Sequence, residues 1–306
     1  MNLRLNILLL LSLLVVNLFS QEAETKKKWT TGGKIGANLS EVGFYNWSKG
    51  GDNSMAGTSF LQAFANRDTN GWAWENKLDL EFGIKQNQNE ILKKTDDRIE
   101  LNSKLGRQIN QHLYFTAFLN FKTQFTEGFD YEKSDVYYTS NIMAPGYLTI
   151  GLGLDYKPNE YFSALIAPLS SKTTIVLDER LADAGSFGVK AAEYDISGMK
   201  IKDGQTFREE IGANITISFK KDIFKNVNLD TKIDLFSNYL ENPQNIDVDW
   251  QTTITMKVNK YLNAVFKTHL IYDDNTNINW EKDGISHLSP ITQFKQSLAV
   301  GLMYEF

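Results

Sequence analysis

Hydrophobic and polar residues alternate with a period of two over many short segments of the chain. In the clearest of them, residues 72–85, Leu78, Leu80, Phe82 and Ile84 share one face, and charged residues occupy the other. This alternation is typical of a β-strand with one apolar face. The pattern predicts twelve strands, over residues 32–42, 54–66, 72–85, 96–109, 113–126, 147–157, 161–177, 207–220, 227–239, 246–258, 261–273 and 293–306.

The connections between these segments alternate in length. They are generally long after odd-numbered strands and short after even-numbered ones. Bacterial outer-membrane barrels combine short periplasmic turns, long external loops and an even number of strands. We therefore predict an all-β fold, a transmembrane antiparallel up-and-down β-barrel of about twelve strands that forms a single domain over residues 21–306. Pro168, inside the seventh segment, predicts a bend or a sheet edge.

The two faces of these strands differ in charge. The apolar face suits lipid, where a Lys or Arg at mid-membrane costs about 2–4 kcal/mol, and the charged face suits a lumen. The candidate lumen-lining residues are Lys77, Asp79, Glu81, Arg98, Glu100, Lys104, Arg208, Glu210, Asp230, Lys232 and Asp234.

The N-terminus predicts export. Arg4 precedes an apolar run over residues 5–19, and Ser20–Gln21 is a plausible cleavage point. The run is shorter than the roughly 20 residues that a membrane-spanning helix needs. Residues 1–20 are therefore predicted to be a signal peptide, with an uncleaved anchor as the alternative, and the expected location is the cell outer membrane.

Charge and cysteine content exclude some classes of partner and site. The net charge is −5, which argues against nucleic acid as the main partner, since a phosphate-binding surface needs a basic excess. The chain has no cysteine, so disulfides and thiolate zinc sites are excluded. Its mean hydropathy of −0.34 is that of a soluble protein, and a soluble β-sandwich with packed aromatic residues is the alternative fold. A lumen face and a lipid face also average to such a value.

The C-terminal segment ends in apolar residues at every second position, including Leu302, Tyr304 and Phe306. This resembles the closing-strand signal that outer-membrane assembly machinery recognises. The expected partners are therefore the barrel-assembly machinery, through this strand, and outer-membrane lipids. The oligomeric state stays open.

Several motifs resemble the family called domain of unknown function 3078, found in Gram-negative bacteria. The most specific are Asn-Trp-x-x-Gly-Gly within residues 46–53 and Gly-Ser-Phe-Gly-Val at residues 185–189. Further motifs lie at 74–79, 167–170, 234–239 and 248–250. The resemblance implies a β-barrel and a bacterial outer membrane. It implies no activity, substrate or catalytic residue.

Two external-loop motifs each have two interpretations. Asn46, Trp47, Gly50 and Gly51 form either a ligand contact or plug, or a turn with Trp47 as an interfacial anchor. The segment 178–206, which contains Gly185, Phe187 and Gly188, either folds inward and narrows the pore or lies outside.

The sequence offers little catalytic chemistry. His112 is expected in a periplasmic turn, His269 in the lumen, and His287 in the last external loop beside Ser286 and Ser289. A hydrolase would need a serine, a histidine and an orienting group in one place. Residues 273–279 lack the glycine and the final acidic residue of a calcium loop. We expect no enzyme, no metal site and no cofactor.

Three functions remain from the sequence. The first is a narrow pore or transport barrel for a small solute. The second is a surface or scaffold barrel that binds a partner through its external loops. The third is a lipid-modifying barrel enzyme.

Overall fold

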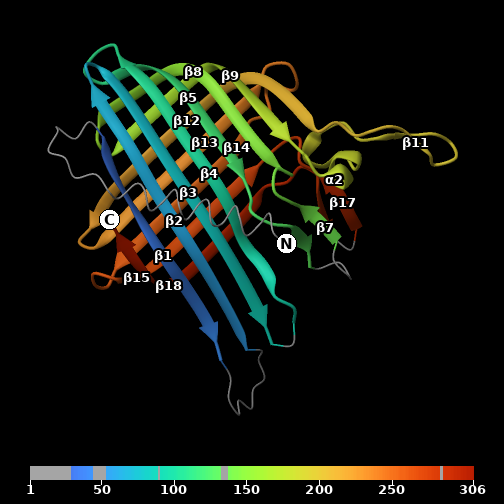
Figure 1. The fold of residues 1–306 in the computed structure, drawn as a ribbon, viewed down its shortest axis with the longest axis horizontal. Coiled ribbons are helices and arrows are strands. Elements are labelled where there is room, and N and C mark those ends of the chain that lie inside the picture. The colour runs from blue at the N-terminus through green and yellow to red at the C-terminus, as the bar shows by residue number, and fades with distance from the viewer. Residues whose placement is uncertain (1–28, 44–52, 89, 132–136, 283–284) are drawn as a thin grey trace, which may run out of the picture.

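The computed structural model describes residues 29–43, 53–88, 90–131, 137–282 and 285–306. The predicted signal peptide and the motif of Asn46, Trp47, Gly50 and Gly51 lie outside these residues. Within the described residues, twelve strands close into one antiparallel barrel, in the order β1-β18-β15-β14-β13-β12-β9-β8-β5-β4-β3-β2 (Figure 1). The predicted fold class and strand number are confirmed.

The barrel strands lie close to the predicted segments. They are β1 (Thr30–Val42), β2 (Ser54–Thr69), β3 (Trp72–Asn87), β4 (Lys93–Gln108), β5 (Leu113–Thr123), β8 (Gly146–Asn159), β9 (Phe162–Ile175), β12 (Phe207–Phe224), β13 (Val227–Asn238), β14 (Asp247–Lys257), β15 (Leu262–Tyr272) and β18 (Gln293–Glu305).

The first and last strands pair with each other and close the sheet. Their register runs from Leu39 opposite Val300 to Lys34 opposite Glu305. Beyond it, the Phe306 N–H donates to the Gly33 carbonyl at 3.0 Å, and the Gly33 N–H donates to the Phe306 carbonyl at 2.9 Å. Closure removes the sheet edge, so the strand backbone can satisfy its hydrogen bonds inside lipid.

Short turns join the strands at one end of the barrel, which we call the short-turn end. They cover residues 70–71, 109–112, 160–161, 225–226 and 258–261. Asn70 and Gly71 have φ angles of 52° and 75°, the left-handed values that a two-residue hairpin turn favours.

Three of these turns share an asparagine whose side-chain oxygen accepts two backbone hydrogen bonds. Such local hydrogen bonds stabilise a turn, where the hydrogen bonds between neighbouring strands end. The bonds run to Asn110 from His112 and Leu113, to Asn159 from Tyr161 and Phe162, and to Asn259 from Tyr261 and Leu262.

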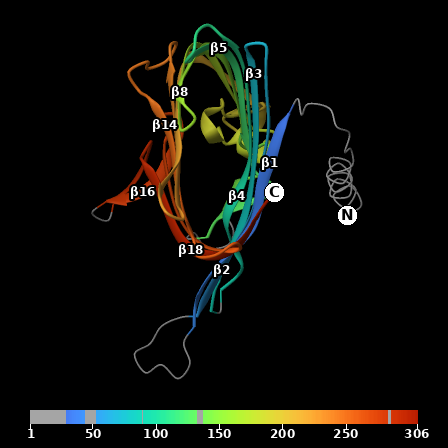
Figure 2. The ribbon, with the colours of Figure 1, turned by 90° about the vertical axis from the view of Figure 1, so that its left-hand side faces the viewer.

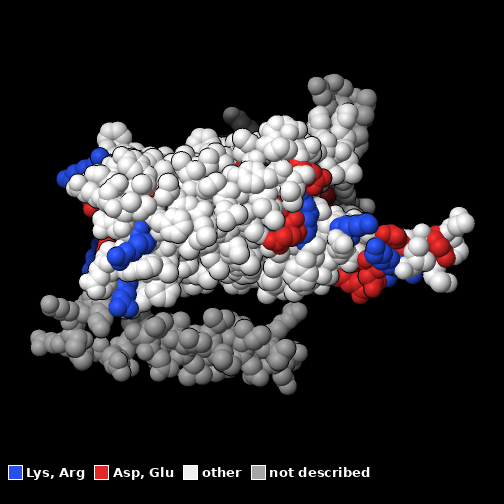
Figure 3. Space-filling view, turned by 90° about the horizontal axis from the view of Figure 1, so that it is seen from above, with Lys and Arg blue, Asp and Glu red and all other residues white. Residues whose placement is uncertain are grey.

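The outer face of the barrel is a broad apolar band. Leu152 and Leu298, on opposite parts of the sheet, expose 41% and 64% of their surface. In a space-filling view, the middle of the visible face is nearly free of charged residues, which lie toward the two ends (Figure 3). A closed barrel with an apolar band and short turns at one end is the structure of an integral outer-membrane protein. By the same rule the short-turn end faces the periplasm.

Pro168 lies at a β-bulge in β9. The pairing with β12 shifts between Gly212 and Asn214, and the side chains on both sides of the bulge keep their orientation. Proline has no N–H for the ladder and is tolerated at such a point. Of the two predictions for Pro168, the bend is therefore correct and the sheet edge is wrong.

The long connections at the other end, which we call the external end, carry small elements of their own. These are β6 (Gly128–Asp130), β7 (Tyr137–Ser140), α2 (Glu179–Asp183), η2 (Ser186–Gly188), β10 (Glu193–Tyr194), β11 (Lys200–Lys202), β16 (Ile278–Lys282) and β17 (Ile285–Ser289). Among the described residues, no helix is long and apolar enough to cross a bilayer.

Candidate functional site

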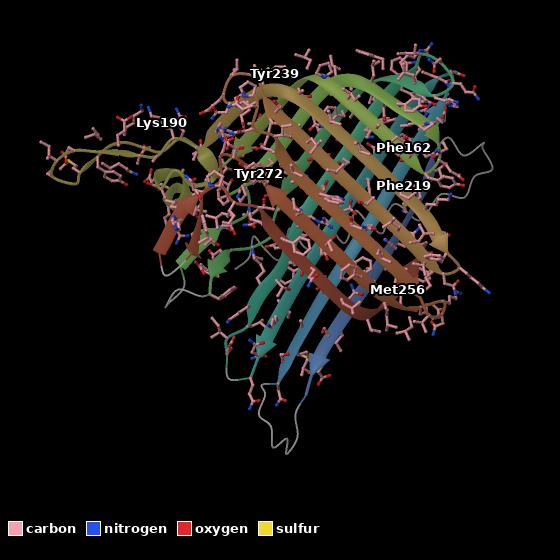
Figure 4. The ribbon with its side chains drawn as sticks, turned by 180° about the vertical axis from the view of Figure 1, so that it is seen from behind. Phe162, Lys190, Phe219, Tyr239, Met256 and Tyr272 are labelled. Carbon is pink, nitrogen blue, oxygen red and sulfur yellow. The ribbon has the colours of Figure 1, made fainter. Side chains whose placement is uncertain are left out.

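A cavity of about 1200 Å³ occupies the inside of the barrel. Its lining includes Phe64 and Glu75 near the short turns, and Tyr147 and Phe187 at the external end. The side chains that mark the two ends of the barrel are visible in Figure 4: Tyr239 and Tyr272 toward the external loops, and Phe162, Phe219 and Met256 toward the short turns. The lumen is therefore a single space that reaches both ends of the strands.

Side chains from opposite walls meet across this lumen. Seen nearly end-on, the barrel is flattened, with β14 facing β3 across the short dimension (Figure 2). The Lys122 ammonium on β5 lies 2.8 Å from Asp249 on β14. The Lys232 ammonium on β13 lies 3.0 Å from Glu100 on β4. These contacts join β4 and β5 directly to β13 and β14.

Further contacts extend the same set of bridges. Arg98 on β4 donates to Gln251 on β14, and Lys267 on β15 pairs with Glu81 on β3. We call the whole set the crossing cluster. It consists of Glu81, Arg98, Glu100, Lys122, Lys232, Asp234, Asp249, Gln251 and Lys267.

The charges in the crossing cluster compensate one another. Glu100 is only 3% exposed, yet it accepts hydrogen bonds from Lys232, Asn102 and Asn120. A buried carboxylate is tolerated when it is paired and its remaining lone pairs are hydrogen-bonded. Removing one partner alone would leave an uncompensated charge, which typically costs about 3–5 kcal/mol.

Two further ion-pair groups lie on either side of the crossing cluster. Near the short turns, Lys104 lies 3.3 Å from the fully buried Asp155, which also accepts a hydrogen bond from Ser163. Near the external end, Lys172 lies 2.6 Å from Asp247 and 3.4 Å from Asp273. Charges of both signs therefore lie near both ends of the lumen and in the crossing cluster between them.

The structure places most of the predicted lumen-lining residues along the cavity. Those that line it are Lys77, Asp79, Glu81, Arg98, Glu100, Lys104, Asp230, Lys232 and Asp234. The other two, Arg208 and Glu210, form an ion pair at 2.8 Å near the external end, and Glu210 is only 1% exposed.

The sequence analysis left four members of the crossing cluster out of its candidate set: Lys122, Asp249, Gln251 and Lys267. All four lie on the polar face of a strand that the period-two pattern predicts. The signal that finds them is the same alternation, applied to the fifth, tenth and eleventh segments. These side chains reach across the lumen because the cross-section is flattened. A local sequence pattern does not predict the shape of the cross-section.

Residues 176–192, which we call the cap, fold over the external mouth. Val176, Leu181, Ala182 and Val189 form a small apolar core with Ala144 of the neighbouring connection. Phe187 packs against this core and also lines the cavity. In the end-on view, the cap helix lies within the outline of the barrel (Figure 2).

The glycines of the cap let it approach the barrel wall closely. Gly185 and Gly188 have φ angles of 70° and 78°, which side chains disfavour. A Cβ atom at Gly188 would lie 2.5 Å from Nη1 of Arg208. The two interpretations of segment 178–206 both hold in part, because the cap folds inward while the β10–β11 hairpin projects away from the barrel (Figure 1).

Asp178 fixes the start of the cap. Its carboxylate accepts from the backbone N–H groups of Arg180 and Leu181, and from the Tyr138 hydroxyl at 2.8 Å. The Arg180 guanidinium lies 3.8 Å from the centre of the Tyr138 ring. Partial burial raises the pKa of the Asp178 carboxyl, but the hydrogen bonds from Tyr138 and Arg180 outweigh it and hold that pKa below its ordinary value.

Replacing Asp178→Ala should loosen the cap and leave the barrel intact. The helix loses its N-cap, which costs about 1 kcal/mol, and the cap also loses its hydrogen bond to Tyr138. We expect faster limited proteolysis within residues 176–206 and an unchanged unfolding temperature of the barrel. Asp178→Asn, which keeps a side-chain oxygen for the N-cap, is the control. Equal proteolysis of both variants would contradict this account of the cap.

Leu302 and Tyr304 lie on the outer face of β18 near the short turns, with exposed fractions of 62% and 54%. Phe306 follows them at the seam with Gly33. The structure thus places the three residues at the junction that closes the barrel, and their recognition by assembly machinery stays a prediction.

The histidines occupy separate environments. His112 lies in a short turn, as expected, and His269 lines the lumen with Nε2 2.9 Å from Asp249. His287 stacks on Trp280, with 4.7 Å between the ring centres. The Trp280 indole donates to the Ser289 hydroxyl at 2.9 Å. Among the described residues, no cluster of side chains could hold a metal ion.

Residues 39–129 match the model of a family described as "Protein of unknown function (DUF3078)". The predicted resemblance is confirmed over this stretch, whereas the motifs at 167–170, 185–189, 234–239 and 248–250 fall outside it. No curated protein matches the chain.

Solved outer-membrane barrels resemble the structure at low sequence identity. An outer membrane channel from Pseudomonas putida F1 is 10% identical, with a TM-score of 0.39, over 93% of this chain and 100% of that one. The NanC porin is 8% identical, with a TM-score of 0.37, over 88% and 98%. The translocator domain of the autotransporter NalP from Neisseria meningitidis is 8% identical, with a TM-score of 0.37, over 92% and 90%.

Proposed function

We propose that the protein is a narrow channel that carries small hydrophilic solutes across the outer membrane. The observation that supports this is the single cavity, whose lining residues run from the short-turn end to the external mouth. A cavity of about 1200 Å³ has room for on the order of 40 water molecules at about 30 Å³ each. A barrel that served only as a membrane anchor would not need a hydrated interior of this size.

The strand number limits the solute to a small one. Barrels of eight strands are filled by side chains, whereas barrels of sixteen to eighteen strands hold an aqueous channel. Twelve strands lie between these cases, and here the crossing cluster takes up the centre of the lumen. Passage is therefore limited to the space beside the cluster, which favours hydrated ions and solutes no larger than a monosaccharide.

The charge of the lumen favours weak ion selectivity. Lysines and arginines lie beside carboxylates in the crossing cluster and in the Lys172 group. A pore that selects strongly by charge would carry a ring of one sign. We expect anions and cations to pass at similar rates.

Planar-bilayer recording and solute uptake by proteoliposomes test this proposal. Purified folded barrel should give small, discrete conductance steps and should let a monosaccharide enter faster than a trisaccharide. The control is the same preparation unfolded by heat, which has lost its heat-modifiable gel mobility. A folded barrel that shows neither conductance nor uptake would contradict the channel.

The alternative of a surface barrel that binds a partner has one observation in its favour. The β10–β11 hairpin presents Tyr194, Ile196, Met199 and Ile201, each more than half exposed. Its turn is held by Asp195, which accepts from the backbone N–H groups of Ser197 and Met199. Deleting residues 193–202 should leave conductance unchanged if the protein is a channel, and loss of conductance would indicate that the hairpin takes part in it.

A further inference from the structure

Four cations project from the outer face of the barrel near the short turns. Arg67, Arg107 and Lys221 lie on the outer faces of β2, β4 and β12, and Lys260 lies in the turn of residues 258–261. Arg107 pairs across the sheet with Trp72 and Phe115, whose exposed side chains mark the lipid-facing side. Likewise, Lys221 lies ten residues after the outward-facing Ile211 on β12. Because side chains on a strand alternate with a period of two, Lys221 points to the same side as Ile211. We call these four residues the basic rim.

Each cation of the basic rim lies over an aromatic ring. The distances to the ring centres are 5.9 Å for Arg67 over Trp29, 5.3 Å for Arg107 over Trp72, 4.5 Å for Lys221 over Tyr161 and 5.4 Å for Lys260 over Tyr261. A ring positioned in this way attracts the cation and limits its motion. Trp and Tyr also favour the interface between the hydrocarbon and the headgroups. The charges are therefore held at headgroup level.

The basic rim is not neutralised by the protein. Among the described residues, no carboxylate oxygen lies within 4.0 Å of a charged nitrogen of these four side chains, although Asp68 and Glu160 are near in sequence. Arg107 donates only to the Asn70 carbonyl, at 2.8 Å. The lumen differs, because Lys104, Lys122, Lys172 and Lys232 all lie in ion pairs.

The outward-facing charges at the other end of the barrel include acidic ones. Glu41 follows the outward Leu39, and Glu209 precedes the outward Ile211 and accepts from the Thr173 hydroxyl at 2.6 Å. Figure 3 shows mainly Lys and Arg at the short-turn end of the visible face, and Asp and Glu side chains mixed with Lys and Arg toward the external end. The outward-facing carboxylates of Glu41 and Glu209 therefore distinguish the external end from the basic rim.

We propose that the basic rim binds the phosphate groups of anionic phospholipids in the periplasmic leaflet of the outer membrane. Guanidinium and ammonium groups form charge-assisted hydrogen bonds with phosphate oxygens. Basic residues beside a membrane-spanning segment are attracted to anionic lipid in the same way. The apolar band already contacts the acyl chains, so the rim extends an existing lipid interface to the headgroups.

Spin-labelled lipids test this interface in reconstituted vesicles of phosphatidylcholine. The motion-restricted fraction of labelled phosphatidylglycerol, compared with labelled phosphatidylcholine, gives their relative association constant for the barrel. We expect the natural protein to prefer phosphatidylglycerol by about two- to four-fold. Arg107→Gln together with Lys221→Gln should bring this ratio close to one, and Arg107→Lys alone should keep it. Heat-modifiable gel mobility verifies that each variant is folded.

The matched control removes the same charge from the external side. Lys190→Gln together with Lys202→Gln, both exposed beyond the external mouth, should keep the preference. Loss of preference in this control, or its absence from the natural protein, would overturn the proposal. Inorganic phosphate should lower the preference no more than sodium chloride of equal ionic strength. A larger effect of phosphate would indicate a site for the free anion and would overturn the lipid as its ligand.

Discussion

Glu100→Ala together with Lys232→Ala is expected to raise the single-channel conductance several-fold. These two side chains bridge β4 and β13 across the lumen at 3.0 Å, next to the contacts between Lys122 and Asp249. Removing both leaves the net charge unchanged and replaces two long side chains of the crossing cluster with methyl groups. Planar-bilayer recording of the purified variant measures the effect.

The control for this variant is an ion pair of the same residue types outside the lumen. Glu179 and Lys200 lie 2.9 Å apart on the cap and the β11 strand. Glu179→Ala together with Lys200→Ala should leave the conductance unchanged. Equal conductance of the lumen variant and the natural protein would show that the crossing cluster does not limit passage.

Leu298→Arg is expected to lower the free energy of unfolding of the barrel by about 2–4 kcal/mol. Leu298 lies in the middle of β18 and is 64% exposed on the outer face, where the arginine would meet hydrocarbon. A guanidinium there loses its hydration without gaining a partner. Denaturant titration in lipid vesicles, followed by tryptophan fluorescence, measures the loss.

Ser297→Arg, at the adjacent position of the same strand, separates the two faces. Ser297 lines the lumen, where water and carboxylates are available, so its replacement should cost little. The side-chain period of two makes neighbouring positions differ in this way. If the two variants lost equal stability, the assignment of the lipid-facing side of β18 would be wrong.

Much of the fold could be predicted from the sequence because a barrel strand carries its own signal. The alternation in 72–85 predicts both the strand and its two faces, and β3 has that extent within a few residues. The length pattern of the connections then predicts which end is periplasmic. The turn asparagines Asn110, Asn159 and Asn259 also share a sequence pattern, because two residues after each comes His or Tyr and then Leu or Phe.

The site was less predictable, for a geometric reason. Alternation shows that Glu100 and Lys232 face inward, but four other strands lie between β4 and β13 around the sheet. The strand pattern carries no information about the shape of the cross-section. The cap posed the same difficulty. Its glycines predict unusual turns, whereas its position over the mouth depends on contacts with Ala144 of another connection and with Arg208 of β12.

The flattened outline of the barrel has a consequence for its capacity. The number of strands and their stagger fix the perimeter of a closed sheet, but they leave the shape of its cross-section free. Here the pairs across the lumen hold two walls together and set that shape. For a fixed perimeter a circle encloses the largest area. Where these pairs separate, the barrel can therefore become rounder and its lumen wider. This change adds no strand and breaks no backbone hydrogen bond.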